Sequence, residues 1–233
     1  MQHRFTLGSE EGAARCAARF VIERGGVLVE YKTVKQEASD DFVERRSRFI
    51  GHALPVKSEE EAVAFINRMK TEYWDADHNV YAYILRDGQI RRYSDDGEPQ
   101  GTAGIPVLDV IQKSGLVDVV VVVTRYFGGI LLGAGGLVRA YSHGASLALS
   151  AAQPLTMRMF ELAELVCDYN QYGRVSSLIP ECGGTIDNTE FTDQVRIQYH
   201  MTADDRPSFA KKLADATAGQ VAFSVSEEKY FAC

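Results

Sequence analysis

Short apolar runs and apolar–polar alternation predict strands through the first two thirds of the chain. Five segments show this pattern: residues 27–34, 42–46, 49–56, 80–85 and 90–93. The last two flank Asp87-Gly88, a dipeptide that favours a tight turn between paired strands. Residues 119–123 are five consecutive valines. A strand without polar alternation is typical of a central strand buried on both faces, and we expect one here.

Apolar residues at helical spacing predict three helices between these strands. Residues 58–73 begin with Ser58 and Glu61, the spacing of a capping box, and continue as an amphipathic helix. A second helix is expected to start at Pro106 and to stop at Gly115, because proline favours a first helical turn and glycine a last one. The third, over residues 137–152, follows a glycine-rich loop.

The pattern changes near Gln153-Pro154, and a second ordered series follows. It comprises strand 157–167, helix 172–181, strands 185–191 and 195–201, a helix from Asp205 to Ala216, and strand 221–230. The order β-α-β-β-α-β is that of the ferredoxin-like fold. The sequence therefore predicts an α+β protein with a loosely ordered extension over residues 1–30, one domain over 31–153 and a second over 156–233.

Composition narrows the classes of function. The chain has 233 residues, 45% of them hydrophobic, with no apolar stretch long enough for a membrane span and no signal-peptide pattern, so we expect a cytoplasmic protein. The net charge of −7 argues against non-specific coating of nucleic acid but leaves room for one basic surface. The four cysteines form no C-x-x-C pair, so neither a zinc site nor a disulfide framework is expected.

The glycine-rich loop after the valines has two interpretations. Its glycines are Gly128, Gly129, Gly133, Gly135 and Gly136. Such a loop before a helix can expose amide groups to an anion, with Arg125 and Arg139 as supporting cations. The usual phosphate-loop motifs are absent, because no Lys-Ser or Lys-Thr follows the glycines. The other interpretation is that the glycines only permit close strand–helix packing.

A second distinctive segment is acidic. Asp95, Asp96 and Glu98 could hold a divalent cation, form an acidic docking surface, pair with nearby arginines, or lie in a solvated turn. His78 and Asn79 follow two aspartates, so His78 could be a tuned base or could cap local backbone. No set of residues in the sequence forms a recognisable catalytic constellation, and no cofactor is expected beyond a divalent cation at the acidic segment.

Arginines gather between residues 45 and 48. Arg46 and Arg48 would share one face of a strand, and with Tyr93, Tyr126 or Phe127 they would suit single-stranded nucleic acid. A solvated strand face explains the same pattern.

These segments occur together in an order that resembles the IMPACT/YigZ family. The resemblance is carried by Ser47 to Gly51, His78-Asn79, Ser94 to Pro99, Gly101 to Gly104 with Pro106, residues 121–129 and residues 133–141. It covers residues 31–152 strongly, and residues 157–233 resemble the small C-terminal domain of bacterial members. The sequence departs from the family pattern at Leu131, where members often carry Lys, which weakens the anion interpretation of the loop.

The resemblance implies a fold and a role. The first domain should resemble the second domain of the fifth ribosomal small-subunit protein, with a left-handed β-α-β crossover. The second should resemble the ferredoxin-like C-terminal domain of elongation factor G. The eukaryotic namesake regulates translation with an added domain that this chain lacks. The resemblance therefore implies a translation-linked, non-enzymatic binding protein whose partner is the ribosome, RNA or a translation regulator.

The surface expected to bind combines most of the residues singled out above. They are Arg125, Tyr126, the glycine loop, Arg139, His78, Asn79, Asp95, Asp96 and Glu98. Two alternatives stay open: a cation-dependent enzyme acting on a phosphorylated small molecule, and a protein-docking module.

Overall fold

The computed structural model describes residues 22–24 and 27–233. The chain separates into two compact units, Met1–Thr156 and Met157–Cys233. We call these units the N-terminal and C-terminal domains.

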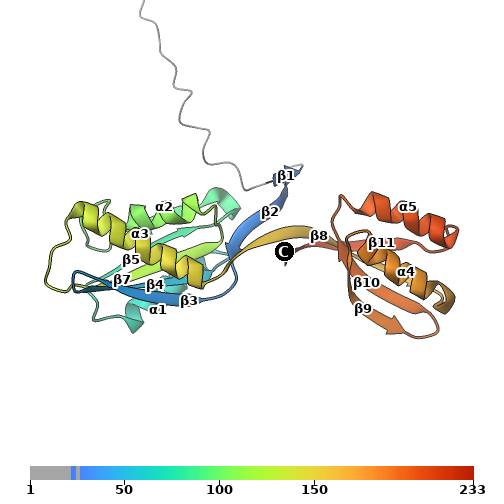
Figure 1. Ribbon diagram of the computed structural model, residues 1–233, viewed down its shortest axis with the longest axis horizontal. Helices are drawn as coiled ribbons and strands as arrows, with labels where there is room; N and C mark the ends of the chain where they lie inside the picture. Colours follow the sequence, from blue (N-terminus) through green and yellow to red (C-terminus); the bar gives the residue numbers. More distant parts are fainter. Residues whose placement is uncertain (1–21, 25–26) are drawn as a thin grey trace, which may run out of the picture. The chain divides into compact units, whose positions relative to one another are not determined.

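The N-terminal domain is built on a five-stranded antiparallel sheet, and its elements are shown in Figure 1. In chain order they are β1 (Ile22–Arg24), β2 (Val27–Val34), β3 (Ala38–Glu44), β4 (Ser47–Pro55), α1 (Glu59–Glu72), β5 (His78–Ile84), the short 3₁₀ turn η1 (Asp87–Gln89), β6 (Arg91–Ser94), α2 (Gly104–Lys113), β7 (Val119–Tyr126) and α3 (Ala134–Ala151). The sheet has the strand order β3-β4-β7-β5-β6. Both β4 and β5 are antiparallel to β7, so they run in the same direction and α1 forms a crossover between them.

The valines of β7 are shared between two hydrophobic cores. Val119, Val121 and Val123 belong to the core beneath α2 and α3, whereas Val120 and Val122 belong to the core beneath α1. Figure 1 shows α1 on one face of the sheet and α2 and α3 on the other. The prediction of a central strand buried on both faces is confirmed.

The capping signal at Ser58 predicted the start of α1 correctly, but the predicted starts of two other helices are wrong. Ser58 caps α1, accepting a hydrogen bond from the amide of Glu61 at 3.3 Å, while the Glu61 carboxylate accepts from the amide of Lys57. In contrast, α3 begins at Ala134 and α4 at Tyr169, earlier than predicted. Their first turns carry glycine or polar residues, which show no apolar period.

The predicted extension over residues 1–30 reached too far along the chain. Residues 1–21 of that segment lie outside the described residues. Residues 22–24 form β1, which pairs antiparallel with β2, and β2 begins at Val27. Strand pairing therefore begins before the expected domain start at residue 31.

The C-terminal domain has the expected β-α-β-β-α-β order. Its elements are β8 (Pro154–Cys167), α4 (Tyr169–Glu181), β9 (Thr185–Phe191), β10 (Val195–Met201), α5 (Arg206–Thr217) and β11 (Phe223–Ala232). The sheet order β11-β8-β10-β9 is antiparallel throughout, as in the ferredoxin-like fold. Residues of α4 and α5 complete the core on one sheet face. The predicted two-domain α+β fold is confirmed. Among the described residues, no helix combines the length and apolarity needed to cross a membrane.

We expect one buried histidine to make the stability of the N-terminal domain sensitive to acid. His52 on β4 is 2% exposed; its Nδ1 lies 2.8 Å from Ser39 Oγ, and within the described ranges its Nε2 has no partner. Burial lowers the pKa of His52 to about 4. The imidazole therefore stays neutral in the folded protein at pH values where the unfolded chain has already taken up a proton.

We expect this difference to lower the free energy of unfolding by about 2 kcal/mol between pH 7 and pH 5. The sign follows because the unfolded state binds more protons in this range, so stability is lost as the pH falls. Urea denaturation at both pH values measures the effect. The variant His52→Gln should lose this part of the pH dependence. If His52→Gln lost as much unfolding free energy between pH 7 and pH 5 as the wild type does, the assignment to His52 would be contradicted.

Candidate functional site

Most of the predicted site residues lie at one end of the five-stranded sheet. At this end β7 finishes, and its last residues pair with the first residues of the neighbouring strands: Tyr126 with Arg48 on β4, and Arg125 with His78 on β5. Four connections meet here: residues 45–46, 73–77, 95–103 and 127–133. The long β7–α3 connection is visible at the left of Figure 1. We call this region the loop end.

Arg125 lies inside the loop end. Its guanidinium pairs with Glu98 at 2.5 Å, and the side chains of the two residues are only 6% and 3% exposed. The Tyr141 hydroxyl of α3 donates to the same Glu98 oxygen at 2.7 Å, and Arg125 Nη2 lies 3.4 Å from Ser47 Oγ. Burial beside Glu98 raises the pKa of Tyr141, so its hydroxyl remains a donor. Arg125 is thus an internal cation that Glu98 holds in the interior, and it is not exposed on the surface on which the sequence placed it.

His78 and Asn79 fasten the acidic segment to the sheet. His78 Nδ1 lies 2.8 Å from the backbone oxygen of Asp96, and its Nε2 lies 3.8 Å from Glu98. The backbone amide of Asn79 donates to Asp96 Oδ2 at 2.7 Å. The side-chain oxygen of Asn79 accepts from the Thr124 hydroxyl at 2.7 Å. Both residues therefore position the loop that carries Asp96 and Glu98.

The three carboxylates of the acidic segment have separate partners. Asp95 accepts hydrogen bonds from backbone amides at the start of α2, including Gly104 at 2.8 Å. Asp96 pairs with Lys70 at 2.6 Å, and Glu98 pairs with Arg125. In the part of the chain that the structure describes, no group of three acidic, histidine or cysteine side chains is arranged to hold a metal ion. The interpretation that fits this geometry is pairing and turn formation.

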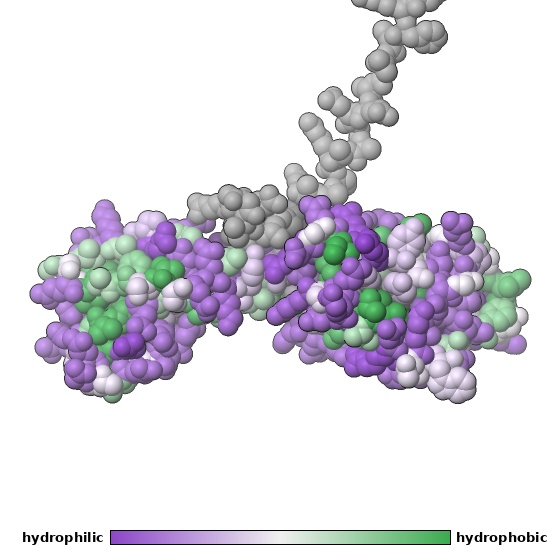
Figure 2. All heavy atoms as spheres, turned by 180° about the vertical axis from the view of Figure 1, so that it is seen from behind, coloured by the Kyte–Doolittle hydropathy of each residue, from purple (hydrophilic) through white to green (hydrophobic). Residues whose placement is uncertain are grey.

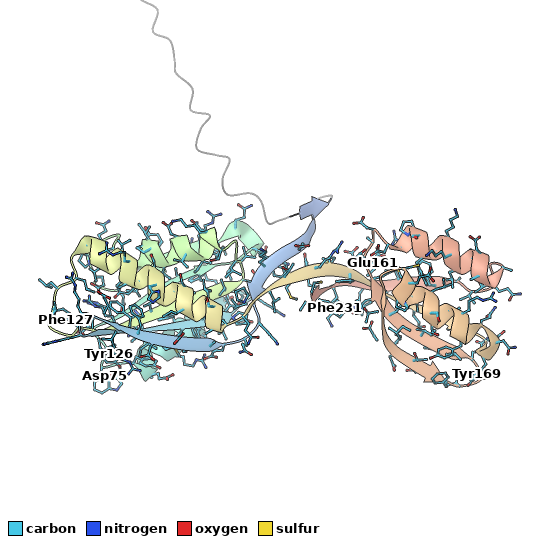
Figure 3. The ribbon with its side chains drawn as sticks, in the orientation of Figure 1. Asp75, Tyr126, Phe127, Glu161, Tyr169 and Phe231 are labelled. Carbon is cyan, nitrogen blue, oxygen red and sulfur yellow. The ribbon has the colours of Figure 1, made fainter. Side chains whose placement is uncertain are left out.

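Tyr126 and Phe127 join the end of β7 to the loop that follows α1. Tyr126 Oη donates to Asp75 at 2.9 Å, and the Phe127 amide donates to Asp77 at 2.7 Å. Figure 3 shows Asp75, Tyr126 and Phe127 together at the loop end. The Phe127 side chain stays 44% exposed, which leaves an aromatic ring at the surface beside the glycine loop.

The glycines serve different purposes. A Cβ on Gly128 would overlap the backbone carbonyl of Arg46, so Gly128 permits the β3–β4 turn to pack against the loop. Gly129 and Gly133 have φ angles of 80° and 72°, in the left-handed region that favours glycine. Gly135 lies in the first turn of α3, whose N-cap, Gly133, provides no side-chain hydrogen bond. Close packing explains Gly128, while the first turn of α3 remains uncapped.

A pocket of about 370 Å³ opens beside that first turn. Its lining residues come from β3, the β3–β4 turn, the glycine loop and α3: Phe42, Glu44, Arg45, Leu132, Gly136, Arg139, Ala140 and His143. We call it the α3 pocket. The sequence indicated Arg45, Gly136 and Arg139 but missed Phe42, Leu132 and His143. The spacing of Arg139 and His143, one helical turn apart, is the signal that could have found His143.

Two arginines, Arg45 and Arg139, line the α3 pocket, and Arg46 follows Arg45 in the same turn. Arg48 pairs with Asp41 at 3.0 Å, so the predicted patch of Arg46 with Arg48 is partly neutralised. Among the residues that the structure describes, no ion pair includes Arg45, Arg46 or Arg139. All three side chains are exposed. Three arginines without ion-pair partners among the described residues therefore lie at this end of the sheet.

Replacing Arg125 should destabilise the N-terminal domain rather than remove a surface contact. We expect Arg125→Ala to lower the free energy of unfolding by about 3–5 kcal/mol, because Glu98 would be left as a buried, unpaired charge. Arg139→Ala is the matched control and should change stability by less than about 0.5 kcal/mol, since Arg139 is exposed and unpaired. Urea denaturation compares the two variants. Equal losses would contradict the structural role of Arg125.

Comparisons with known proteins agree with this architecture. Residues 45–149 match the Impact N-terminal domain, and residues 165–220 match the Domain of unknown function (DUF1949). The chain is 34% identical over 205 residues to the IMPACT family member YvyE of Bacillus subtilis (strain 168), covering 88% of this chain and 94% of YvyE. It is 38% identical over 189 residues to the IMPACT family member YigZ of Escherichia coli (strain K12), covering 79% and 92%.

A solved structure titled "Crystal structure of an hypothetical protein" is similar along most of the chain. The TM-score is 0.55 at 32% sequence identity, covering 86% of this chain and 99% of the other. The two domain matches and the long, nearly complete alignments to bacterial members lead to one conclusion. The chain belongs to the IMPACT family.

Proposed function

We propose that this protein acts in translation, in the cytoplasm, as a binding protein that contacts RNA on the ribosome. The observation that carries the proposal is the group of three exposed arginines at the loop end, Arg45, Arg46 and Arg139, which form no ion pair with any residue that the structure describes. Membership of the IMPACT family supports the connection with translation, because the family resemblance implies such a role. No catalytic step is proposed, because the acidic segment uses its carboxylates within the fold.

The chemistry of the loop end suits an RNA backbone. Guanidinium groups bind phosphate oxygens in a planar, paired geometry. The half-exposed ring of Phe127 can stack on an unpaired base, a contact that tolerates any sequence. With a net charge of −7, the protein would be repelled elsewhere along the polymer. This combination favours one local contact with the RNA over non-specific coating of the polymer.

A protein-docking function is the second candidate, and a separate observation favours it. Leu131 is 82% exposed, and Phe127 and Ile130 beside it are 44% and 39% exposed. Figure 2 shows hydrophobic residues at this end of the N-terminal domain, on the right of the view. Exposed apolar side chains of this kind, rimmed by polar residues, are typical of surfaces that contact another protein.

Removing two of the unpaired arginines should weaken RNA binding and its dependence on salt. We expect Arg45→Gln with Arg139→Gln to reduce affinity for a single-stranded RNA by at least about ten-fold. The slope of log affinity against log salt should become shallower by about 1.4, because two phosphate contacts are lost. Filter binding at several salt concentrations and co-sedimentation with purified ribosomes measure these effects.

Arg91→Gln is the control for charge. Arg91 is exposed and pairs in the sheet with Ile84, at the opposite end from the loop end. It should leave both the affinity and the salt slope nearly unchanged. Equal affinity in the double variant and the wild type would overturn the RNA proposal. Ribosome association that survives nuclease treatment and is lost in Leu131→Asp would instead favour protein docking.

A further inference from the structure

We infer that the α3 pocket binds a nucleoside 5′-monophosphate, either as a free nucleotide or as the phosphorylated 5′ end of an RNA. The choice of a nucleotide rests on the proposed RNA contact. The presence of an anion site rests on the pocket itself: its size, its charge, its backbone geometry and its apolar wall.

The size of the pocket limits the ligand. About 370 Å³ lies near the lower end of the range for small-molecule sites. Such a volume accommodates about one nucleotide but not a continuous strand. The pocket therefore favours a terminal group that enters from solvent over an internal segment of a polymer.

The charge around the pocket favours a phosphomonoester. Arg45 and Arg139 contribute two cations without ion-pair partners in the described residues. Glu44 also lines the pocket and offsets part of this charge. The first turn of α3 contains no acidic residue that would repel an anion from the pocket. A terminal phosphate, with a charge of about −1.5 to −2, complements this set better than a singly charged diester.

The backbone of the β3–β4 turn indicates that the Arg45 side chain is needed where it is. Arg45 and Arg46 both have left-handed φ angles, 46° and 68°. A two-residue turn of this kind between paired strands favours Asn-Gly, and side chains with a bulky Cβ are disfavoured in it. Strained residues of this type gather at sites where function requires them. Here the turn places Arg45 at the pocket. Gly128 lies against the backbone of Arg46 and leaves room for the turn.

Part of the pocket wall is apolar. Phe42 stacks on Phe49 with ring centroids 5.2 Å apart, and His143 packs edge-on against Phe42 at 4.6 Å. Leu132 and Ala140 complete the wall. This surface suits the sugar and one face of a base, while the phosphate lies toward the arginines. Adenosine lacks the phosphate and would therefore make no charged contact with the arginines.

Isothermal titration of the full chain with AMP, with no RNA present, tests the inference. We expect AMP to bind and adenosine not to bind under the same conditions. Arg139→Gln should weaken AMP binding by at least about ten-fold, and the control Arg91→Gln should not. The paired change Arg45→Asn with Arg46→Gly should also weaken AMP binding, while raising the thermal midpoint by about 2–4 °C through relief of the turn. A more stable variant that binds less well cannot be explained by misfolding.

Two RNA arms distinguish the source of the phosphate. If the ligand is an RNA end, a 5′-phosphorylated oligonucleotide should compete with AMP at least about ten-fold better than its 5′-hydroxyl counterpart. If the ligand is free nucleotide, neither oligonucleotide should compete, and AMP binding itself then supports the inference. Absent AMP binding, or AMP binding unchanged in both arginine variants, would overturn it. If the protein binds RNA but not AMP, the inference fails and the proposed function is still supported. If it binds AMP but not RNA, the proposed function fails and the inference is still supported.

Discussion

The ion pair between Arg125 and Glu98 fixes the geometry of the loop end. A buried pair gains little stability over apolar packing, but it holds its partners in one arrangement. Glu98 receives hydrogen bonds from β7 through Arg125 and from α3 through Tyr141, and His78 on β5 lies close by. The acidic loop, the sheet and the helix that lines the α3 pocket are therefore joined at one carboxylate. Surface arginines that are carried by a rigid framework lose less conformational entropy when they bind a ligand.

Most of the fold could be predicted from the sequence, because helix and strand periods are local properties. Strands β9 and β10 were predicted with the bounds that the structure has, and Ser58 marked the start of α1. The site was harder to predict. The sequence drew attention to Arg125 but could not show that it faces inward, because its partner Glu98 lies 27 residues away along the chain. Pairing across loops is a long-range property that no local pattern records.

The loop end also separates residues that support the fold from residues that are free to bind. The acidic segment, His78 and Asn79 are all engaged with the fold through side chains or backbone. Arg45, Arg46 and Arg139 instead lie at the surface, and the first two have left-handed backbone conformations that are unfavourable for arginine. Natural proteins commonly give up some stability at the positions that carry function. The distinction between these two groups is the main change that the structure brings to the sequence-based picture.

The division of the β7 valines between two cores has a consequence for how the N-terminal domain opens. Because alternate side chains of one strand complete the layers under α1 and under α2 and α3, neither layer can detach without exposing β7. We therefore expect local opening to be confined to the edge strands and loops, and the amide protons of β7 to exchange with solvent only when the whole domain unfolds. The two layers should then unfold as one cooperative unit, with β7 as its most protected segment.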